Sequence, residues 1–265
     1  MTGLSRARTL GLFGLLVVAL LFGAPVLALL LRLPWDRAAD LIGRREVLDA
    51  LKLSLWTATT SAILAAAFGL PVALWLSSGR GPVRAMARVL VTLPMVLPPV
   101  VGGLLLLLAF GRSGVFGSVL DEWFGIGLPF TSGAVITAQA WIAMPFFVLT
   151  VENGIRGLDQ RPLEAARTLG ASPAQAFFAV TLPAIRPTIA TGTVIAWARA
   201  LGEFGATITF AGNLRGETRT MPLQVYAGFQ SDPDTAIVTS FVLLTIAVIV
   251  LVLSRNHWLP RSTDR

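Results

Sequence analysis

The residues best placed to do chemistry in this 265-residue chain are two opposite charges inside an apolar segment. Arg199 and Glu203 lie four residues apart in VIAWARALGEFGATITF, a spacing that puts both on one face of a helix, close enough to pair. Charges inside a membrane cost at least a few kcal/mol each, so they should face the bundle interior or water. Two interpretations stay open. The pair is a structural salt bridge, or it lines a translocation path or gate in which Arg199 offsets an anion's charge and Glu203 prevents overly tight binding.

Neighbouring residues extend this candidate pore or gate site. They are two glycines that would allow close backbone approach and two threonines that offer hydroxyls on the following turns: Gly202, Gly205, Thr207 and Thr209. In a second apolar segment, LPMVLPPVVGG, Pro98 and Pro99 remove backbone donors, so this helix should be kinked or locally unwound. In a membrane its freed carbonyls need protein or water partners. The break either shapes packing alone or lines the pathway.

Other chemistries are disfavoured by composition. The chain has no cysteine, and its one histidine, His257, lies near the C-terminus, so no metal site and no catalytic triad is predicted. A Walker A motif needs a lysine after glycine, but the only lysine, Lys52, follows Leu51. The chain is therefore expected to be a non-enzyme without a cofactor of its own.

The elements that hold these residues are transmembrane helices. Apolar residues make up 55% of the sequence and charged residues 13%, and several uncharged runs reach the roughly 20 residues that cross a bilayer as a helix. An all-α polytopic membrane protein with six spans is predicted. The spans fall within Thr9–Leu31, Leu53–Leu76, Val89–Phe110, Ser132–Val151, Thr188–Phe210 and Thr235–Ser254. The first run is longer than the core of a cleaved secretory signal, which stays the minor alternative.

Charge distribution predicts the orientation. Most arginines fall in cytoplasmic segments if the N-terminus is inside, and six spans then place both termini in the cytoplasm. The first external loop is the exception, with Arg32, Arg37, Arg44 and Arg45. The net charge of +7 does not indicate nucleic-acid binding, because the basic residues flank spans and form no stripe interleaved with aromatics.

A soluble-looking helical elbow, EAARTLGASPAQAFFAVTLP, separates the fourth and fifth spans. Gly170 suits the left-handed position just past a helix end. Ser172 can cap the next helix, with Pro173 at its first position and Gln175 completing a capping box. Leu182-Pro183 is expected to end or kink that helix, and Pro187 to open the next span.

The spacing of this elbow resembles the EAA loop of importer-type ABC permeases. The matching positions are Glu164-Ala165-Ala166, Gly170, Val180 and Leu182-Pro183. The resemblance implies a type I ABC importer fold, with a cytoplasmic coupling loop at 156–187 whose short helix docks on a separate ATPase subunit. The coupling residues it implies are Glu164, Ala165, Ala166, Thr168, Gly170, Ala171, Ser172, Pro173, Leu182 and Pro183.

Two further stretches narrow the resemblance. ARALGEFGATITFAGN and GETRTMPLQVY are similar to the molybdate-type permeases, relatives of the sulfate-type permeases, which share only the LGE(F/Y)G core. The similarity extends from about residue 48 to 252. It implies a permease for molybdate or tungstate in the inner membrane, working as a homodimer with two ATP-binding cassette subunits, which hold the ATP and Mg²⁺, and an external oxyanion-binding protein. Sulfate is the alternative substrate.

The chain is expected to divide into an N-terminal end, first span and external loop at 1–47, a permease core at 48–254 and a cytoplasmic tail at 255–265. A secondary anion transporter would show midplane carboxylates and an inverted repeat, but only Glu203 is found and the elbow would be unexplained. A membrane-embedded hydrolase would need an acidic or metal constellation. The adjacent acidic pair, Asp121-Glu122, lies in a predicted external loop and is expected to be solvated.

Overall fold

The computed structural model describes residues 2–254, with side chains from Gly11 onward. The predicted cytoplasmic tail, which includes His257, lies outside this range. The described chain contains helices and no strands. Its elements are α1 (Thr2–Arg32), α2 (Ala38–Ile42), α3 (Arg45–Ser77), α4 (Pro82–Val96), α5 (Pro99–Phe110), α6 (Gly117–Phe124), α7 (Ser132–Arg156), α8 (Arg161–Thr168), α9 (Pro173–Ala176), the π-helical turn η1 (Phe177–Thr181), α10 (Leu182–Leu201), α11 (Gly205–Phe210), α12 (Met221–Ser231) and α13 (Pro233–Ser254). The all-α expectation is confirmed.

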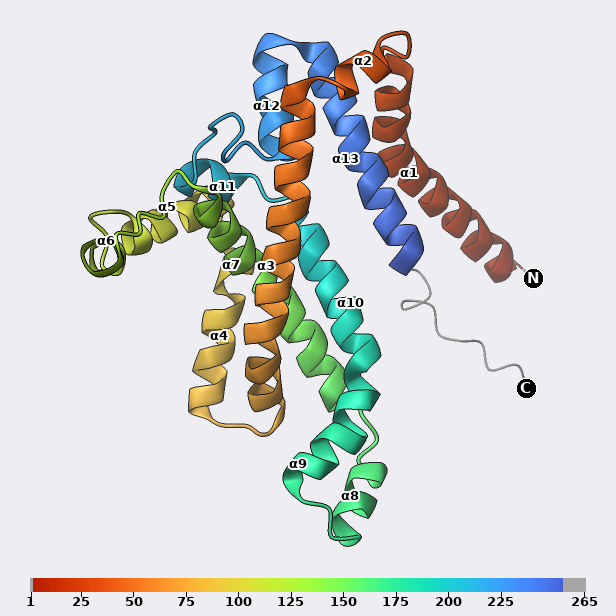
Figure 1. Ribbon diagram of the computed structural model, residues 1–265. Coiled ribbons are helices and arrows are strands. Elements are labelled where there is room, and N and C mark those ends of the chain that lie inside the picture. The colour runs from red at the N-terminus through yellow and green to blue at the C-terminus, as the bar shows by residue number, and fades with distance from the viewer. Residues whose placement is uncertain (1, 255–265) are drawn as a thin grey trace.

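Five of these helices are long and apolar enough to cross a membrane, and the number rises to six if the bent pair α4–α5 counts as one span. The chain bends by 119° between the two halves of that pair. The predicted third span, Val89–Phe110, is therefore not one straight helix: α5 turns aside toward α6 (Figure 1). Pro98 in extended conformation and Pro99 at the first position of α5 account for the break, because neither donates a backbone hydrogen bond.

The core of the bundle is formed by α3, α7 and α10. Their interface is rich in alanine, with Ala58, Ala65, Ala73, Ala143 and Ala196 fully buried. Small residues let these backbones approach: a Cβ on Gly69 would lie 2.8 Å from the ring of Phe147. The tightly packed helices α3, α7 and α10 thus form the core, and α4 and α11, which adjoin the helix breaks, pack against α7.

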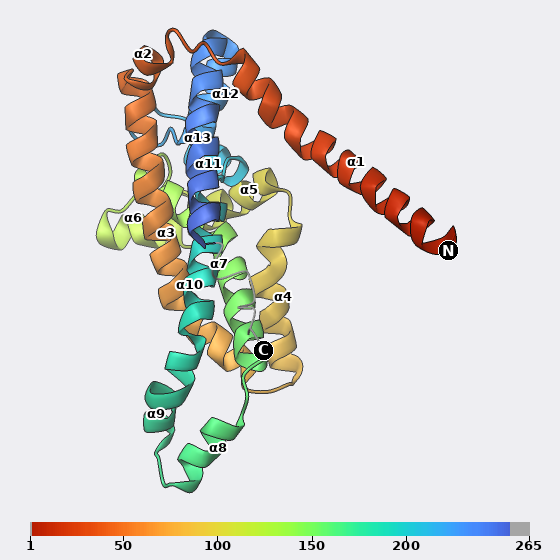
Figure 2. The ribbon, with the colours of Figure 1, turned by 90° about the vertical axis from the view of Figure 1, so that its right-hand side faces the viewer.

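Helix α1 stands apart from the bundle. It runs obliquely away from the other helices (Figure 2), and its side chains from Gly11 to Ala28 are exposed. An apolar helix with so few protein neighbours suits a lipid environment. The N-terminal end of α1 and the C-terminal end of α13 both point toward the end of the molecule that carries α8 and α9 (Figures 1 and 2).

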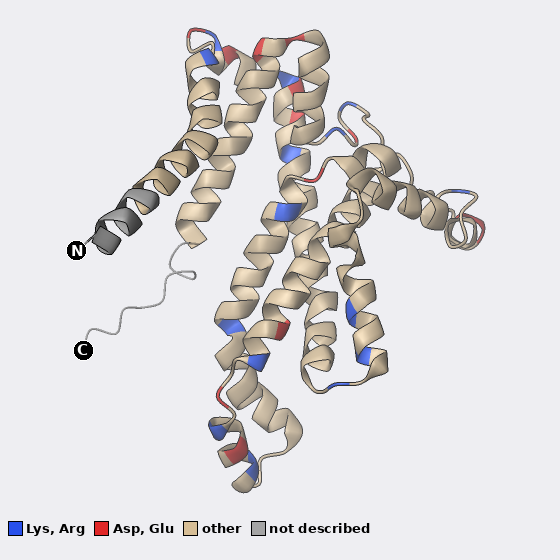
Figure 3. Ribbon diagram, turned by 180° about the vertical axis from the view of Figure 1, so that it is seen from behind, with Lys and Arg blue, Asp and Glu red and all other residues tan. Residues whose placement is uncertain are grey.

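The arginines of the loop after α1 are held by acidic partners. Arg44 donates to Asp232 at 2.6 Å and to Thr235 at 2.9 Å, and Arg37 pairs with Asp234. Charged positions gather at the ends of the long helices and in the connections, leaving the middles largely uncharged (Figure 3). These arginines tie α2 and its flanks to the start of α13, so their presence on the side opposite α8 and α9 has a structural cause.

The helix that follows the elbow is continuous, contrary to the sequence expectation. Leu182-Pro183 does not end the second elbow helix, because α9, η1 and α10 join into one helical run over Pro173–Leu201. Pro183 lies inside this run, directly after the wider π-helical turn in which the N–H of Leu182 bonds the carbonyl of Phe177, so the expected disturbance at Leu182-Pro183 takes the form of a π-helical turn. Pro187 lies inside α10 and does not open it.

Candidate functional site

The ion pair expected within the fifth span exists, but the helix breaks between its two members. Arg199 Nη1 lies 2.6 Å from Glu203 Oε2. Helix α10 ends at Leu201, and Glu203 follows it in a short non-helical connection before α11. The predicted continuous span Thr188–Phe210 is therefore wrong in its last third. The Glu203 side chain is only 1% exposed, whereas that of Arg199 is 29% exposed.

Glu203 also starts the next helix. Its Oε1 accepts the backbone N–H of Ala206 at 2.9 Å, one of the donors that have no partner inside the first turn of α11. A carboxylate at this position also interacts favourably with the positive end of the helix dipole. The buried charge is thus compensated on both oxygens, by Arg199 and by α11.

The second broken element packs directly against this one. A Cβ on Gly205 would lie 2.6 Å from Pro99 Cβ, and a Cβ on Gly103 would lie 2.6 Å from Thr209 Cβ. The start of α5 and the whole of α11 are therefore in backbone-level contact, which only glycine permits here. The structure brings Pro99, Gly205 and Thr209 together at one contact, with Pro98 adjacent in the chain.

The remaining predicted pore residues differ in their surroundings. Gly202 is exposed, and a Cβ there would meet only the carbonyl of Ala198 at 3.7 Å, so no close approach occurs at Gly202 within residues 2–254 of this chain. Thr209 donates its hydroxyl to the carbonyl of Gly205 within α11. Thr207 is fully buried, and its hydroxyl has no hydrogen-bond partner among the described residues.

The elbow has the local geometry that its sequence predicts. Gly170 has φ +84°, in the left-handed region, immediately after Leu169 at the end of α8. Ser172 and Gln175 form the reciprocal capping box, with Pro173 at the first position of α9. The other implied coupling residues follow the same path: Glu164, Ala165, Ala166 and Thr168 in α8, Ala171 in the turn, and Leu182 and Pro183 at the start of α10.

The tip of the elbow is open to contact. Leu169 is 88% exposed, and α8 contains no buried residue. From this tip the helical run Pro173–Leu201, which includes the π-helical turn η1, leads to the Arg199–Glu203 break, a length of roughly 40 Å at 1.5 Å per residue. A displacement at the elbow can therefore be passed to the ion pair along a single element.

Glu152 is a second buried carboxylate, which was not identified as a functional residue from the sequence. Glu152, in α7, is 3% exposed and lies 2.5 Å from Arg88 of α4 and 3.0 Å from Arg156 of its own helix. Arg156 also donates to the carbonyl of Leu76 at the end of α3. The i,i+4 spacing of Glu152 and Arg156 was a signal for this pair, but Arg88 joins only through the fold.

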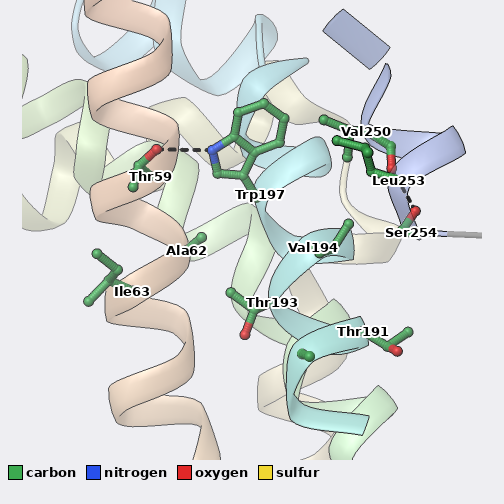
Figure 4. A pocket seen from close by; sticks show the side chains of 11 residues that line it. Thr59, Ala62, Ile63, Thr191, Thr193, Val194, Trp197, Val250, Leu253 and Ser254 are labelled. Atoms are coloured by element: carbon green, nitrogen blue, oxygen red, sulfur yellow. Dashed lines mark hydrogen bonds between the residues drawn. The ribbon is translucent and has the colours of Figure 1, made fainter. Parts of the chain in front are cut away.

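An apolar groove between α3, α10 and α13 is unsuited to an oxyanion. Its volume is about 420 Å³, and Trp197 donates its indole N–H to Thr59 Oγ1 at 3.1 Å across it (Figure 4). None of its lining residues is charged. The positive charge that an oxyanion needs lies at Arg199, outside this groove.

A bundle of membrane-spanning helices with two broken helices in contact, and a helical elbow at one end, defines this chain as a multi-pass membrane permease. The family model described as the inner membrane component of binding-protein-dependent transport systems matches residues 65–265, and the chain belongs to that family.

Individual relatives agree with this family. The chain is 42% identical over 240 residues to the molybdenum transport system permease protein ModB of Mycobacterium bovis, covering 91% of this chain and 90% of the relative. It is 39% identical over 213 residues to ModB of Escherichia coli K12, covering 80% and 93%. The resemblance to molybdate-type permeases is thereby confirmed.

The fold also has a solved counterpart. It matches a chain of a bacterial alginate ABC transporter, solved in complex with an alginate pentasaccharide-bound periplasmic protein, with a TM-score of 0.74 at 19% identity, covering 94% of this chain and 92% of that one. The type I ABC permease fold expected from the sequence is confirmed.

Proposed function

We propose that this chain is the membrane-spanning permease subunit of an ATP-driven importer that moves molybdate, or the similar tungstate oxyanion, from an external binding protein into the cytoplasm. The observation that carries the proposal is the 42% identity to a molybdenum transport permease across 91% of the chain. A sulfate-type permease is the alternative within the same class.

The transporter in this proposal contains a second copy of the chain, two ATP-binding cassette subunits and the external binding protein. ATP and Mg²⁺ bind in the ATPase subunits, because the single lysine leaves this chain without a Walker A site. Membership of a binding-protein-dependent family supports the external partner. The elbow and both termini face the cytoplasm, in keeping with the distribution of arginines.

The proposed mechanism uses the connection between elbow and ion pair. ATP-driven closure of the ATPase subunits pulls the exposed tip around Leu169 and Gly170. The helical run Pro173–Leu201 carries that motion to the break at Gly202, where α10 can turn relative to the α5–α11 unit. The path then alternates between outward-open and inward-open states.

Arg199 is the residue proposed to meet the anion. Its Nη1 is bound to Glu203, but the Arg199 side chain is 29% exposed, whereas that of Glu203 is almost fully buried, so Arg199 is the accessible member of the pair. Glu203 offsets its charge, which keeps the oxyanion from being held too tightly to leave. Thr207, whose hydroxyl has no hydrogen-bond partner in the described part of the chain, is an additional donor if α11 shifts during transport.

The test is ATP hydrolysis by the complex of this chain and its ATPase subunit in lipid. Molybdate-loaded binding protein should stimulate hydrolysis, whereas unloaded protein should not. Stimulation by sulfate-loaded protein instead would replace the substrate. Transport driven by a proton gradient without any ATPase subunit would contradict the importer proposal altogether.

A further inference from the structure

A second polar feature lies at the elbow, far along α10 from the Arg199–Glu203 pair. It is a pocket of about 770 Å³ between the ends of α3 and α7, helix α8 and the start of the helical run α9–η1. Its lining residues are Leu74, Ser77, Ser78, Arg80, Ile155, Arg156, Gln160, Leu163, Arg167, Pro173, Ala176, Phe177 and Thr181. The inner face of the elbow forms one wall, and the end of the core bundle forms the other.

The lining carries three arginines and no acidic residue. Arg80 comes from the connection after α3, Arg156 from the end of α7 and Arg167 from α8, so three separate elements direct positive charge to one hollow. A fourth arginine, Arg84, donates to Ser78 Oγ at the pocket edge, at 3.3 Å. Like charges brought together this way repel one another unless an anion lies between them.

Arg156 is held in place by the protein. Its Nε donates to Glu152 Oε1 and its Nη2 to the carbonyl of Leu76, each at 3.0 Å. Because Glu152 also binds Arg88, that carboxylate is shared between two guanidinium groups and cannot neutralise both. A guanidinium that is anchored at one edge loses little side-chain entropy when it binds an anion at its other edge.

Arg80 and Arg167 have their charge available. Neither takes part in the ion pairs formed by the side chains of residues 11–254. Both are exposed, so they can turn toward a ligand in the pocket. The pocket thus combines one fixed and two adjustable guanidinium groups, an arrangement that matches the several oxygens of a phosphate group.

We propose that this pocket is a second anion site, which binds a phosphate group. The group belongs to the headgroup of an anionic phospholipid or to free inorganic phosphate. Basic pockets between helices at the cytoplasmic face are known to suit anionic headgroups. A phosphate there would link Arg80 and Arg156 at the end of the bundle to Arg167 of the elbow, so its occupancy would fix how the elbow sits on the bundle.

The test compares variants of the full-length protein in two binding measurements. In the first, protein reconstituted in phosphatidylglycerol–phosphatidylcholine vesicles is extracted, and the retained phosphatidylglycerol is counted by native mass spectrometry. In the second, binding of radiolabelled inorganic phosphate is measured by equilibrium dialysis in phosphatidylcholine nanodiscs. The pocket variant is Arg80→Gln with Arg167→Gln, and the matched control is Arg161→Gln, an exposed arginine of α8 that does not line the pocket.

The pocket variant should bind the phosphate group about tenfold more weakly in one of the two measurements, while the Arg161→Gln control should match the unchanged protein. Loss of phosphatidylglycerol alone identifies a lipid site, and loss of inorganic phosphate alone identifies a soluble-ion site. Since Arg80 and Arg167 are exposed, both variants should keep the elution volume and melting temperature of the parent. Equal binding by all three proteins, or equal loss in the control, would overturn the proposal.

Discussion

At the scale of single residues, the chemistry of this permease centres on a carboxylate with two partners. Glu203 is almost fully buried, yet its charge is met by Arg199 on one oxygen and by the N–H of Ala206 on the other. Removing a partner from a buried charge is far more costly than removing a surface pair, because the remaining charge has neither water nor a counter-ion.

Arg199→Ala is therefore expected to destabilise the protein by about 3 kcal/mol, the lower part of the range for breaking a buried pair, because Arg199 itself is partly exposed. Thermal unfolding in detergent measures this loss. Adding Glu203→Gln should restore most of the stability, since glutamine still accepts from Ala206 and carries no charge. If the double variant also transported at the full rate, Arg199 would have no direct role toward the anion.

Substitutions at two neighbouring glycines should differ in how strongly they destabilise the protein. Gly205→Val would place side-chain atoms against Pro99, which a Cβ would already approach to 2.6 Å, and should cost about 1–3 kcal/mol by overpacking the α5–α11 contact. Gly202→Ala, where the nearest atom is 3.7 Å away, should leave stability almost unchanged. Melting temperatures of the two variants decide the matter, and equal losses would refute the close α5–α11 contact.

At the scale of elements, the chain uses breaks and caps to set the ends of its helices. The elbow is the clearest example, since Gly170 lets the backbone turn and the Ser172–Gln175 box starts the next helix within two residues. The helix that starts there then reaches the ion pair without interruption.

Gly170→Val should strain this turn by about 1–2 kcal/mol, because a β-branched residue is disfavoured at φ +84°. Membrane insertion should remain normal, while ATP hydrolysis by the complex should lose its stimulation by loaded binding protein. Gly157→Ala, at φ −84° near the other end of the loop, is the matched control and should retain stimulation. Normal stimulation in Gly170→Val would remove the elbow from the coupling route.

Asp232 sets the start of α13 on the opposite side. Hydrogen bonds from Thr235 and Arg44 hold the pKa of the Asp232 carboxyl below its ordinary value. The ionised form therefore adds stability above the pKa of the unfolded chain, and this contribution is lost as the pH falls through the lowered folded pKa.

Asp232→Asn should accordingly reduce the loss of melting temperature between pH 7 and pH 3. At pH 7 the variant should be less stable by no more than about 1 kcal/mol, because the Asp232 side chain is 39% exposed and asparagine still caps a helix. Identical pH profiles for the variant and the parent would contradict a stabilising role for this carboxylate.

At the scale of the whole molecule, buried ion pairs join helices that are distant in the sequence. Glu152 connects α7 to α4 through Arg88, and Arg156 connects it to the end of α3. This cluster holds together the end of the bundle from which the elbow projects.

Glu152→Gln should lower the unfolding free energy by about 1–2 kcal/mol, because it removes the charge-assisted hydrogen bonds to Arg88 and Arg156, while each arginine is about one-third exposed and keeps contact with water. Asp49→Asn, which breaks an exposed pair with Arg45, is the control and should cost less than about 0.5 kcal/mol. Chemical unfolding in mild detergent compares the two, and equal effects would mean that the buried cluster does not hold the bundle end together.

The sequence by itself determined the features that depend on local chemistry. Helical membrane spans followed from long apolar runs, the break after the third span's first half from Pro98 and Pro99, and the turn of the elbow from Gly170 and Ser172. The pairing of Arg199 with Glu203 followed from their four-residue separation, although α10 ends between them and the single helical face assumed for the pair does not exist; the permease family followed from motifs. Each of these signals lies within one continuous stretch of sequence, where backbone and neighbouring side chains decide the outcome.

Only the tertiary structure decided where helices end when their own propensities allow them to continue. Helix α10 contains Pro183 and Pro187 and packs against α3 and α7, and it stops at Leu201, two residues before Glu203 caps the start of α11. The Gly205–Pro99 contact and the Arg88–Glu152 link likewise join segments far apart in the chain. Such contacts depend on the three-dimensional path of the backbone, which no local pattern contains.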